Sequence, residues 1–292
     1  MSRPVSVRTQ FVVFVLFGDV LAPRGGTAWT SGLLQLLRAL GVSDRAARST
    51  LSRMRRRGWL RSERVGRRSR YTLTARGRRL LTEGGQRIFE PRKWAWDGRW
   101  HMVVYSLPES KRALRNALRK RLSWLGFGRL APGTWISVHD RREELAALFD
   151  ELGVGRYAVR FASLRLVDGE DCALVARCWD LPNLNRRYAR FLQRWEPRAR
   201  AALSSGRNPL SPSQSFVEQF WMTLEYSAFP RLDPNLPSAL LPDGWLGDRA
   251  ADLAERYRKV LNPQAGAFVS RALEAAQDGA EWRGERDRAL AA

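Results

Sequence analysis

Apolar residues recur at helical spacing over the first forty residues of the chain. The segment FVVFVLF at 11–17 is continuously apolar, and TSGLLQLLRAL at 30–40 places leucines three and four positions apart. Such spacing predicts helices, which we expect over 8–21 and 30–40. The first segment is too short to cross a bilayer and precedes no small-residue cleavage site. We therefore interpret it as a buried helix and expect no membrane partner.

A third helix is predicted over 43–57, with two unlike faces. At about 100° per residue, Ala47, Leu51 and Met54 form a narrow apolar stripe. Ser43 is a good N-cap, and Gly58 suits the left-handed residue that ends a helix. Polar and basic side chains occupy the opposite side, with Arg48 at its border: Arg45, Ser49, Ser52, Arg53 and Arg56.

A short basic β-hairpin is predicted directly after this helix. Leu60 and Leu73 lie in its two strands, and Gly66 permits a tight turn between them. A helix followed by a basic hairpin is typical of a winged helix-turn-helix, whose helix enters the major groove while its wing meets phosphates or the minor groove. A solvated basic surface without a ligand is the alternative interpretation. The residues expected to contact double-stranded DNA are Arg45, Arg48, Ser49, Ser52, Arg53 and Arg56 on the helix, and Arg67, Arg68 and Arg70 on the wing.

A different pattern begins after residue 91. Strands and helices are predicted in the order β-α-β-β-α-β, which is typical of a ferredoxin-like domain; their ranges are 100–108, 110–126, 127–130, 133–140, 144–153 and 157–167. The remainder is mostly helical around a proline-rich loop. The predicted fold class is thus α+β with three domains: a winged helix-turn-helix over 1–90, a ferredoxin-like middle domain over 91–175 and a mostly helical C-terminal domain over 176–292.

The charge of the chain agrees with a polyanionic partner. The 292 residues carry a formal net charge of +22, which favours nucleic acid or an acidic membrane surface. Only four of the 51 basic residues are lysines, and such an arginine excess also arises from a GC-rich genome. The clustering is therefore more informative than the total, because the acids between 38 and 79 are only Asp44 and Glu63.

Few residues suggest metal or cofactor chemistry. Cys172 and Cys178 have neither redox nor zinc-ligand spacing, so we expect two buried free thiols. The only histidines, His101 and His139, are far apart in the sequence. No phosphate-binding loop, dinucleotide fingerprint or nucleophile motif occurs. We expect no metal, no cofactor and no enzymatic activity.

The order of the motifs resembles the PaaX-like transcriptional regulators, a family named for the repressor of phenylacetic-acid catabolism. The resemblance covers nearly the whole chain, and the matching stretches are FGDVLAPRGG (17–26), LLRALGVSDRAARSTLSRMRRRGWL (36–60), GRRSRYTLTARG (66–77), WHMVVYSLPE (100–109), LGFGRLAPGTWIS (125–137) and DPNLPSALLPDGWLG (233–247). It implies a winged helix, a ferredoxin-like middle domain similar to a CRISPR-adaptation endoribonuclease, and a helical C-terminal domain. The family's DNA-reading helix corresponds to residues 43–57 and its wing to 61–71.

The resemblance also implies how the chain functions. Family members are bacterial, dimeric and mostly repressors, and the founding group releases DNA on binding phenylacetyl-CoA. We therefore expect a cytoplasmic homodimer, associated with the nucleoid when bound to operator DNA and released by an effector such as an aryl- or acyl-CoA thioester. No residue identifies the effector site. Some tryptophans could line an aryl pocket, although each is more typical of a core: Trp124, Trp135, Trp179, Trp195 and Trp221.

Two other functions remain open at this point. The likeness of the middle domain to a metal-dependent ribonuclease suggests an RNA-processing nuclease, which needs a carboxylate at the end of the first strand. That strand ends at Tyr105, the next acid is Glu109, and His139 with Asp140 is the only substitute. A sequence-indifferent architectural DNA protein is the second alternative.

Overall fold

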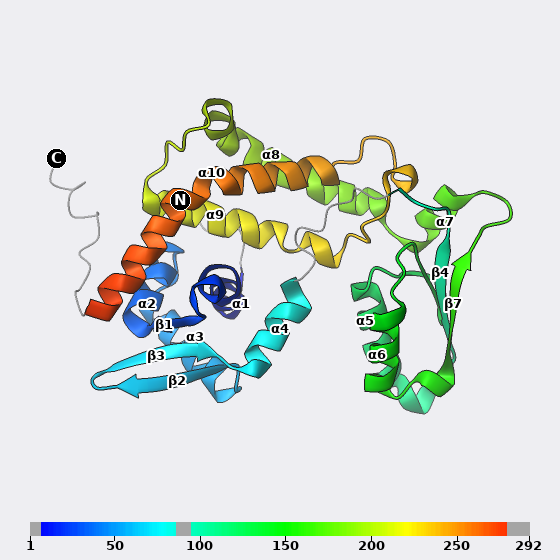
Figure 1. Cartoon of the computed structure of the whole chain (residues 1–292), viewed down its shortest axis with the longest axis horizontal. Helices are drawn as coiled ribbons and strands as arrows, with labels where there is room; N and C mark the ends of the chain where they lie inside the picture. The colour runs from blue at the N-terminus through cyan, green and yellow to red at the C-terminus, as the bar shows by residue number, and fades with distance from the viewer. Residues whose placement is uncertain (1–6, 86–94, 279–292) are drawn as a thin grey trace. The chain divides into compact units, whose positions relative to one another are not determined.

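The computed structural model describes residues 7–85 and 95–278 of an α+β chain (Figure 1). Within these residues the chain forms two compact units: one contains 7–85, 195–226 and 253–278, and the other contains 95–194 and 227–252. The predicted domain boundary at 90/91 lies outside the described residues. The boundary predicted at 175/176 falls inside helix α7 (Asp171–Cys178).

The first part of the first unit contains the predicted three helices and hairpin, followed by a fourth helix. In chain order its elements are α1 (Thr9–Val15), the π-helical segment η1 (Leu16–Leu21), the 3-10 turn η2 (Ala22–Arg24), β1 (Thr27–Trp29), α2 (Thr30–Ala39), α3 (Asp44–Arg56), β2 (Leu60–Val65), β3 (Arg68–Leu73) and α4 (Ala75–Gly85). Helices α1 and α2 both pack against α3. Apolar side chains from all three, including Val13, Leu37 and Leu51, are fully enclosed.

The sequence did not predict strand β1. It adds a third strand to the hairpin in the order β1-β3-β2, with Thr27 opposite Thr72. The hydroxyl groups of these two threonines are 2.8 Å apart. Three residues are too few for an alternating pattern to be visible in the sequence, so the strand depends on its pairing with β3.

Helix α3 begins and ends as its sequence predicts. The Ser43 hydroxyl accepts a hydrogen bond from the Ala46 amide, and Gly58 adopts φ +68° after the last turn. Ala47, Leu51 and Met54 are completely buried. Thr50 is buried as well, so the covered stripe extends further to one side than the apolar residues alone indicate.

The second unit contains a four-stranded antiparallel sheet with the strand order β5-β6-β4-β7. The observed order of elements is the predicted β-α-β-β-α-β: β4 (Trp100–Tyr105), α5 (Arg112–Trp124), β5 (Gly128–Ala131), β6 (Thr134–Ser137), α6 (Arg142–Leu152) and β7 (Ala158–Leu164). Both helices lie on one side of the sheet (Figure 1). The core between these layers includes Val103, Leu118, Trp135 and Leu148.

Two glycines in the stretch LGFGRLAPGTWIS are required by close contacts. Gly133 adopts φ +79°, and a Cβ there would overlap the carbonyl oxygen of Tyr105. A Cβ at Gly128 would overlap the ring of Trp179. Both positions therefore need the absence of a side chain, which gives these motif residues a structural explanation.

The remaining described elements are helical. They are the α-helices α7, α8 (Leu181–Ser205), α9 (Pro212–Tyr226) and α10 (Gly247–Asp278), and the 3-10 turns η3 (Glu109–Lys111), η4 (Gly155–Tyr157), η5 (Phe229–Arg231) and η6 (Ser238–Leu240). Cys172, expected to be buried, is exposed, because it borders an open cavity between α7 and the segment 240–242 and not a packed core; Cys178 is half-buried, and both thiols are free. Nowhere in 7–85 or 95–278 does a helix combine the length and apolarity needed to cross a membrane.

Candidate nucleic-acid interface

The predicted DNA-facing side of α3 is a solvent-exposed surface in the first unit. Arg45, Arg48, Ser49, Arg53 and Arg56 are all exposed, whereas Ser52 is half-buried. These positions lie opposite the side chains of the α3 stripe that anchor the helix to α1 and α2. The helix therefore presents arginines and serines outward from a fixed apolar base.

Hydrogen bonds orient one of these arginines. Arg53 donates from Nη1 to the Ser49 hydroxyl at 3.1 Å and from Nη2 to the Thr50 hydroxyl at 3.0 Å. Because a guanidinium has five donors, others remain available to an acceptor outside the helix. For Arg45, Arg48 and Arg56, the described residues provide no hydrogen bond or ion pair.

The three predicted wing arginines differ in their surroundings. Arg67 sits at the exposed two-residue turn beside Gly66, whose φ is +60°. Arg70 is bound to Glu63 on the opposite strand. Arg68 donates a hydrogen bond from Nη1 to the Ala276 carbonyl oxygen near the end of α10 at 3.2 Å. The last contact was not predicted, since 208 residues separate the partners.

The two acids of this segment are both paired with arginine. Arg38 and Asp44 are 2.9 Å apart, and Arg70 and Glu63 are 2.8 Å apart. Asp44 also lies in the first turn of α3, where the helix dipole favours a negative charge. The positive charge of the remaining arginines is thus left largely uncompensated along α3 and the hairpin turn.

The residues considered for a nuclease do not form a metal site. His139 Nε2 is 2.9 Å from the carbonyl oxygen of Pro234, and Glu109 is bound to Arg115. Arg142 lies 2.7 Å from Asp140, and its hydrogen bonds lower the pKa of that carboxyl. Within the described parts of the chain, no three His, Cys, Asp or Glu side chains converge as metal ligands would. This arrangement does not favour the nuclease alternative.

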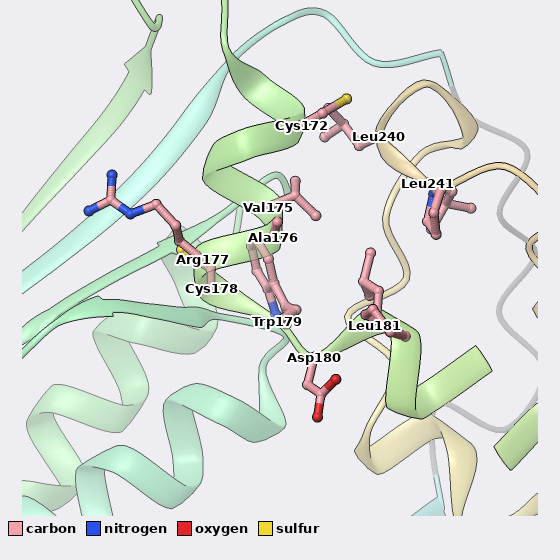
Figure 2. A pocket seen from close by; sticks show the side chains of 12 residues that line it. Cys172, Val175, Ala176, Arg177, Cys178, Trp179, Asp180, Leu181, Leu240 and Leu241 are labelled. Atoms are coloured by element: carbon pink, nitrogen blue, oxygen red, sulfur yellow. The ribbon is translucent and has the colours of Figure 1, made fainter. Parts of the chain in front are cut away.

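Of the five tryptophans considered for an effector pocket, Trp179 lines a cavity in the second unit. The cavity of about 470 Å³ lies between α7 and the segment 240–242 (Figure 2). Val175, Trp179 and Leu181 border it, whereas the Arg177 side chain points away from it (Figure 2). Its wall is mainly apolar and offers no group of converging cations. Trp135, Trp195 and Trp221 are buried in the core.

Comparison with known proteins identifies the family to which the chain belongs. Three family models match the chain: PaaX-like protein over residues 8–77, the PaaX protein central Cas2-like domain over 93–175 and the PaaX-like protein C-terminal domain over 179–271. The transcriptional repressor PaaX of Escherichia coli K12 is 34% identical over 269 residues, which cover 91% of this chain and 84% of that protein. The chain belongs to the PaaX family, which confirms the resemblance carried by its motifs. The relative is named as a regulator and not as an enzyme, in agreement with the expected lack of catalytic activity.

A solved structure shares the fold. The uncharacterized protein Rv0674 from Mycobacterium tuberculosis matches with a TM-score of 0.57 and 23% sequence identity, over 93% of this chain and 99% of that chain. At this identity the match supports the architecture and carries no information on function.

Proposed function

We propose that the protein is a sequence-specific DNA-binding transcriptional regulator, most simply a repressor released by a small-molecule effector. The observation that carries this proposal is the exposed basic side of α3, which is fixed to the core by its opposite stripe and followed directly by a basic hairpin. Membership in a family that contains a transcriptional repressor supports it.

In this proposal, residues 1–90 form a winged helix-turn-helix. The supporting arrangement is a three-helix core with a three-stranded sheet, in which β2 and β3 form the wing. The middle domain is ferredoxin-like, supported by its element order and by a strand order in which the first and third strands are central. The helical remainder completes the proposed three-domain division.

Two kinds of contact would contribute differently to DNA binding, one mainly to sequence specificity and the other mainly to affinity. Arginine and serine side chains of α3 would read base edges in the major groove, because the guanidinium fork matches guanine. The wing residues Arg67, Arg68 and Arg70 would hold phosphates, which give affinity and a steep salt dependence but no sequence information. The groove-facing residues are Arg45, Arg48, Ser49, Ser52, Arg53 and Arg56.

A homodimer on an inverted repeat would follow from the two-fold symmetry of typical helix-turn-helix operators. The effector, for which we expect an aryl- or acyl-CoA thioester, would favour an arrangement of subunits that no longer matches the two half-sites. The protein would act in the bacterial cytoplasm and be associated with the nucleoid while bound to an operator.

A binding assay with matched variants tests the proposal. The double substitution Arg53→Ala with Arg56→Ala should weaken binding to the protein's own upstream DNA by at least about tenfold, since two charged contacts are lost. Arg112→Ala with Arg119→Ala removes the same charge from exposed positions on α5 and should leave affinity nearly unchanged. Equal losses in both variants, or equal affinity for random DNA at physiological salt, would contradict sequence-specific reading by α3. Repeating the assay with acyl-CoA thioesters tests release.

A further inference from the structure

The first unit contains a cleft whose walls combine cationic and aromatic side chains. It has a volume of about 550 Å³ and lies between η1 and η2 on one side and helices α9 and α10 on the other. Ligand sites for small molecules commonly have this size. Its charged lining residues are Asp19, Arg24, Arg258 and Lys259.

The charge balance of this lining favours an anion. Of the three cations in this lining, Lys259 forms an ion pair with Glu255 at 2.6 Å and Arg258 forms one with Asp19 at 3.8 Å. Arg24 is left without a carboxylate partner among the described residues. Arg24 is held in place by a hydrogen bond from its Nη1 to the Val20 carbonyl oxygen at 2.7 Å. Gly266 of α10 lies next to this guanidinium, since a Cβ there would be in van der Waals contact with Arg24 Nη2 at 3.5 Å. The fold therefore positions Arg24 at the cleft.

The remaining apolar lining favours an apolar group on the same ligand. Phe216 and Phe220 of α9, with ring centroids 6.1 Å apart, and Val269 of α10 line the cleft with small exposed edges, since each is only 2% exposed. Gln219, which precedes Phe220 in the chain, also lines the cleft. Its amide oxygen is buried and has no hydrogen-bond partner among the described residues. Such an orphan acceptor is costly and would be satisfied by a donor on a ligand.

The same helix that lines the cleft also contacts the proposed reading domain. Beyond the cleft, the Ala272 carbonyl oxygen of α10 lies so close to Gly32 of α2 that a Cβ at Gly32 would be 3.0 Å away from it. One turn later, the Ala276 carbonyl oxygen accepts the hydrogen bond from Arg68 of the hairpin. A shift of α10 on ligand binding would therefore alter both the seating of α2 and the availability of Arg68.

We propose that this cleft binds an organic anion carrying an aryl or alkyl group, and that α10 transmits its occupancy to the hairpin. The proposed binding site depends only on the observed cleft. The proposed effect of its occupancy on the hairpin also depends on the proposed function. The cavity at Trp179 has no comparable cations and is an alternative binding site. The test distinguishes the two sites, because its variants change the cleft of the first unit alone.

Fluorescence titration with anilinonaphthalenesulfonate, an aromatic organic anion, tests the site. Gly266→Leu fills the cleft and should weaken binding by at least about tenfold. Ala267→Leu adds the same side chain at the exposed neighbouring position on α10 and should leave binding unchanged. Asp19→Asn, which removes the one carboxylate, should strengthen binding. Wild-type affinity of Gly266→Leu, or weaker binding by Asp19→Asn, would overturn the site; thermal unfolding of each variant verifies that it is folded.

Competition defines the ligand class. Benzoate represents anions with an aryl group, and decanoate represents anions with an alkyl group. Displacement of the probe by either compound supports the proposed ligand class. Benzyl alcohol and inorganic phosphate at equal concentration should not displace the probe. Displacement by benzyl alcohol as effective as by benzoate would overturn the need for an anion, and equal displacement by phosphate would overturn the need for an apolar group.

DNA binding with and without saturating probe tests transmission. Occupancy should change the DNA affinity of the wild-type protein by about tenfold, a typical coupling. Gly32→Ala, outside the cleft, should bind the probe normally but show a smaller change, because its Cβ disturbs the contact with Ala272. Probe binding without any change in DNA affinity would overturn transmission alone. Failure of the wild-type protein to bind DNA would instead contradict the proposed function and leave the site intact.

Discussion

Arg70 donates two hydrogen bonds to one carboxylate oxygen of Glu63 across the hairpin, from Nε at 3.0 Å and from Nη2 at 2.8 Å. The two residues are direct partners in the register of β2 and β3, and both side chains are about half exposed. An exposed pair of this kind contributes little to stability. Its larger consequence is electrostatic, because the proposed wing carries an internal counter-ion for one of its phosphate-binding arginines.

Removing that counter-ion should strengthen DNA binding. Glu63→Gln eliminates a negative charge beside the phosphates and releases Arg70, so we expect about two- to tenfold tighter binding at low salt and a smaller gain at high salt. Fluorescence anisotropy over a salt series measures both effects. Glu109→Gln, which breaks an exposed pair with Arg115 in the second unit, serves as the control. A gain no larger than that of the control would show that the hairpin lies away from DNA.

The sequence predicts those parts of the interface that depend on local interactions. Ser43 and Gly58 mark the ends of α3, and the spacing of its apolar residues identifies the outward side. The pairing of Glu63 with Arg70 could also have been inferred, because a two-residue turn at Gly66 and Arg67 places residues 63 and 70 opposite each other. That these outward residues of α3 touch DNA stays a prediction of the proposed function.

Contacts between distant segments could not be predicted in this way. Nothing near Arg68 indicates that its partner is Ala276, and the short strand β1 exists only through its pairing with β3. Cys172 was expected to be a buried free thiol because its spacing from Cys178 is neither redox nor zinc-ligand spacing, yet it is exposed at the edge of the cavity between α7 and the segment 240–242. In each case the tertiary arrangement, and not the local pattern, determines the outcome.

Gly133 should be among the least tolerant positions of the middle domain. Gly133→Ala combines a left-handed backbone at φ +79° with an overlap between Cβ and the Tyr105 carbonyl oxygen. The strained backbone alone costs about 1–3 kcal/mol. Gly155→Ala is the matched control, since its Cβ would meet nothing within 4 Å and its φ is not left-handed. Urea unfolding measures both variants, and similar midpoints would contradict the predicted clash.

Glu218 should make the stability of the first unit depend on pH. Burial raises its pKa above the usual 4.5, although Arg198, 3.2 Å away, lowers it in part. Because the pKa of the folded state exceeds that of the unfolded state, the stabilisation is fully present below about pH 4.5 and is lost as pH rises through the raised value. Glu218→Gln removes this dependence.

The expected result is a free energy of unfolding that falls for the wild-type protein, relative to Glu218→Gln, as the pH rises above about 4.5. Chemical unfolding at several pH values measures the difference. Glu274→Gln, at an exposed position of α10, provides the comparison for the loss of one carboxylate. A difference between wild type and Glu218→Gln that stays constant, or that grows in the opposite direction, would contradict the predicted desolvation.

The two thiols beside the cavity at Trp179 should differ strongly in reactivity. Burial raises the pKa of Cys178 to about 11, so about one thiol in a thousand is ionised at pH 8, and the thiolate is the reactive form. Cys172 is exposed on the same helix. Iodoacetamide should therefore modify Cys172 first in the folded protein and reach Cys178 only after unfolding in urea. Mass spectrometry of Cys172→Ser and Cys178→Ser assigns each adduct; equal rates at the two positions in the folded protein would show that Cys178 is not shielded by its contacts with the sheet.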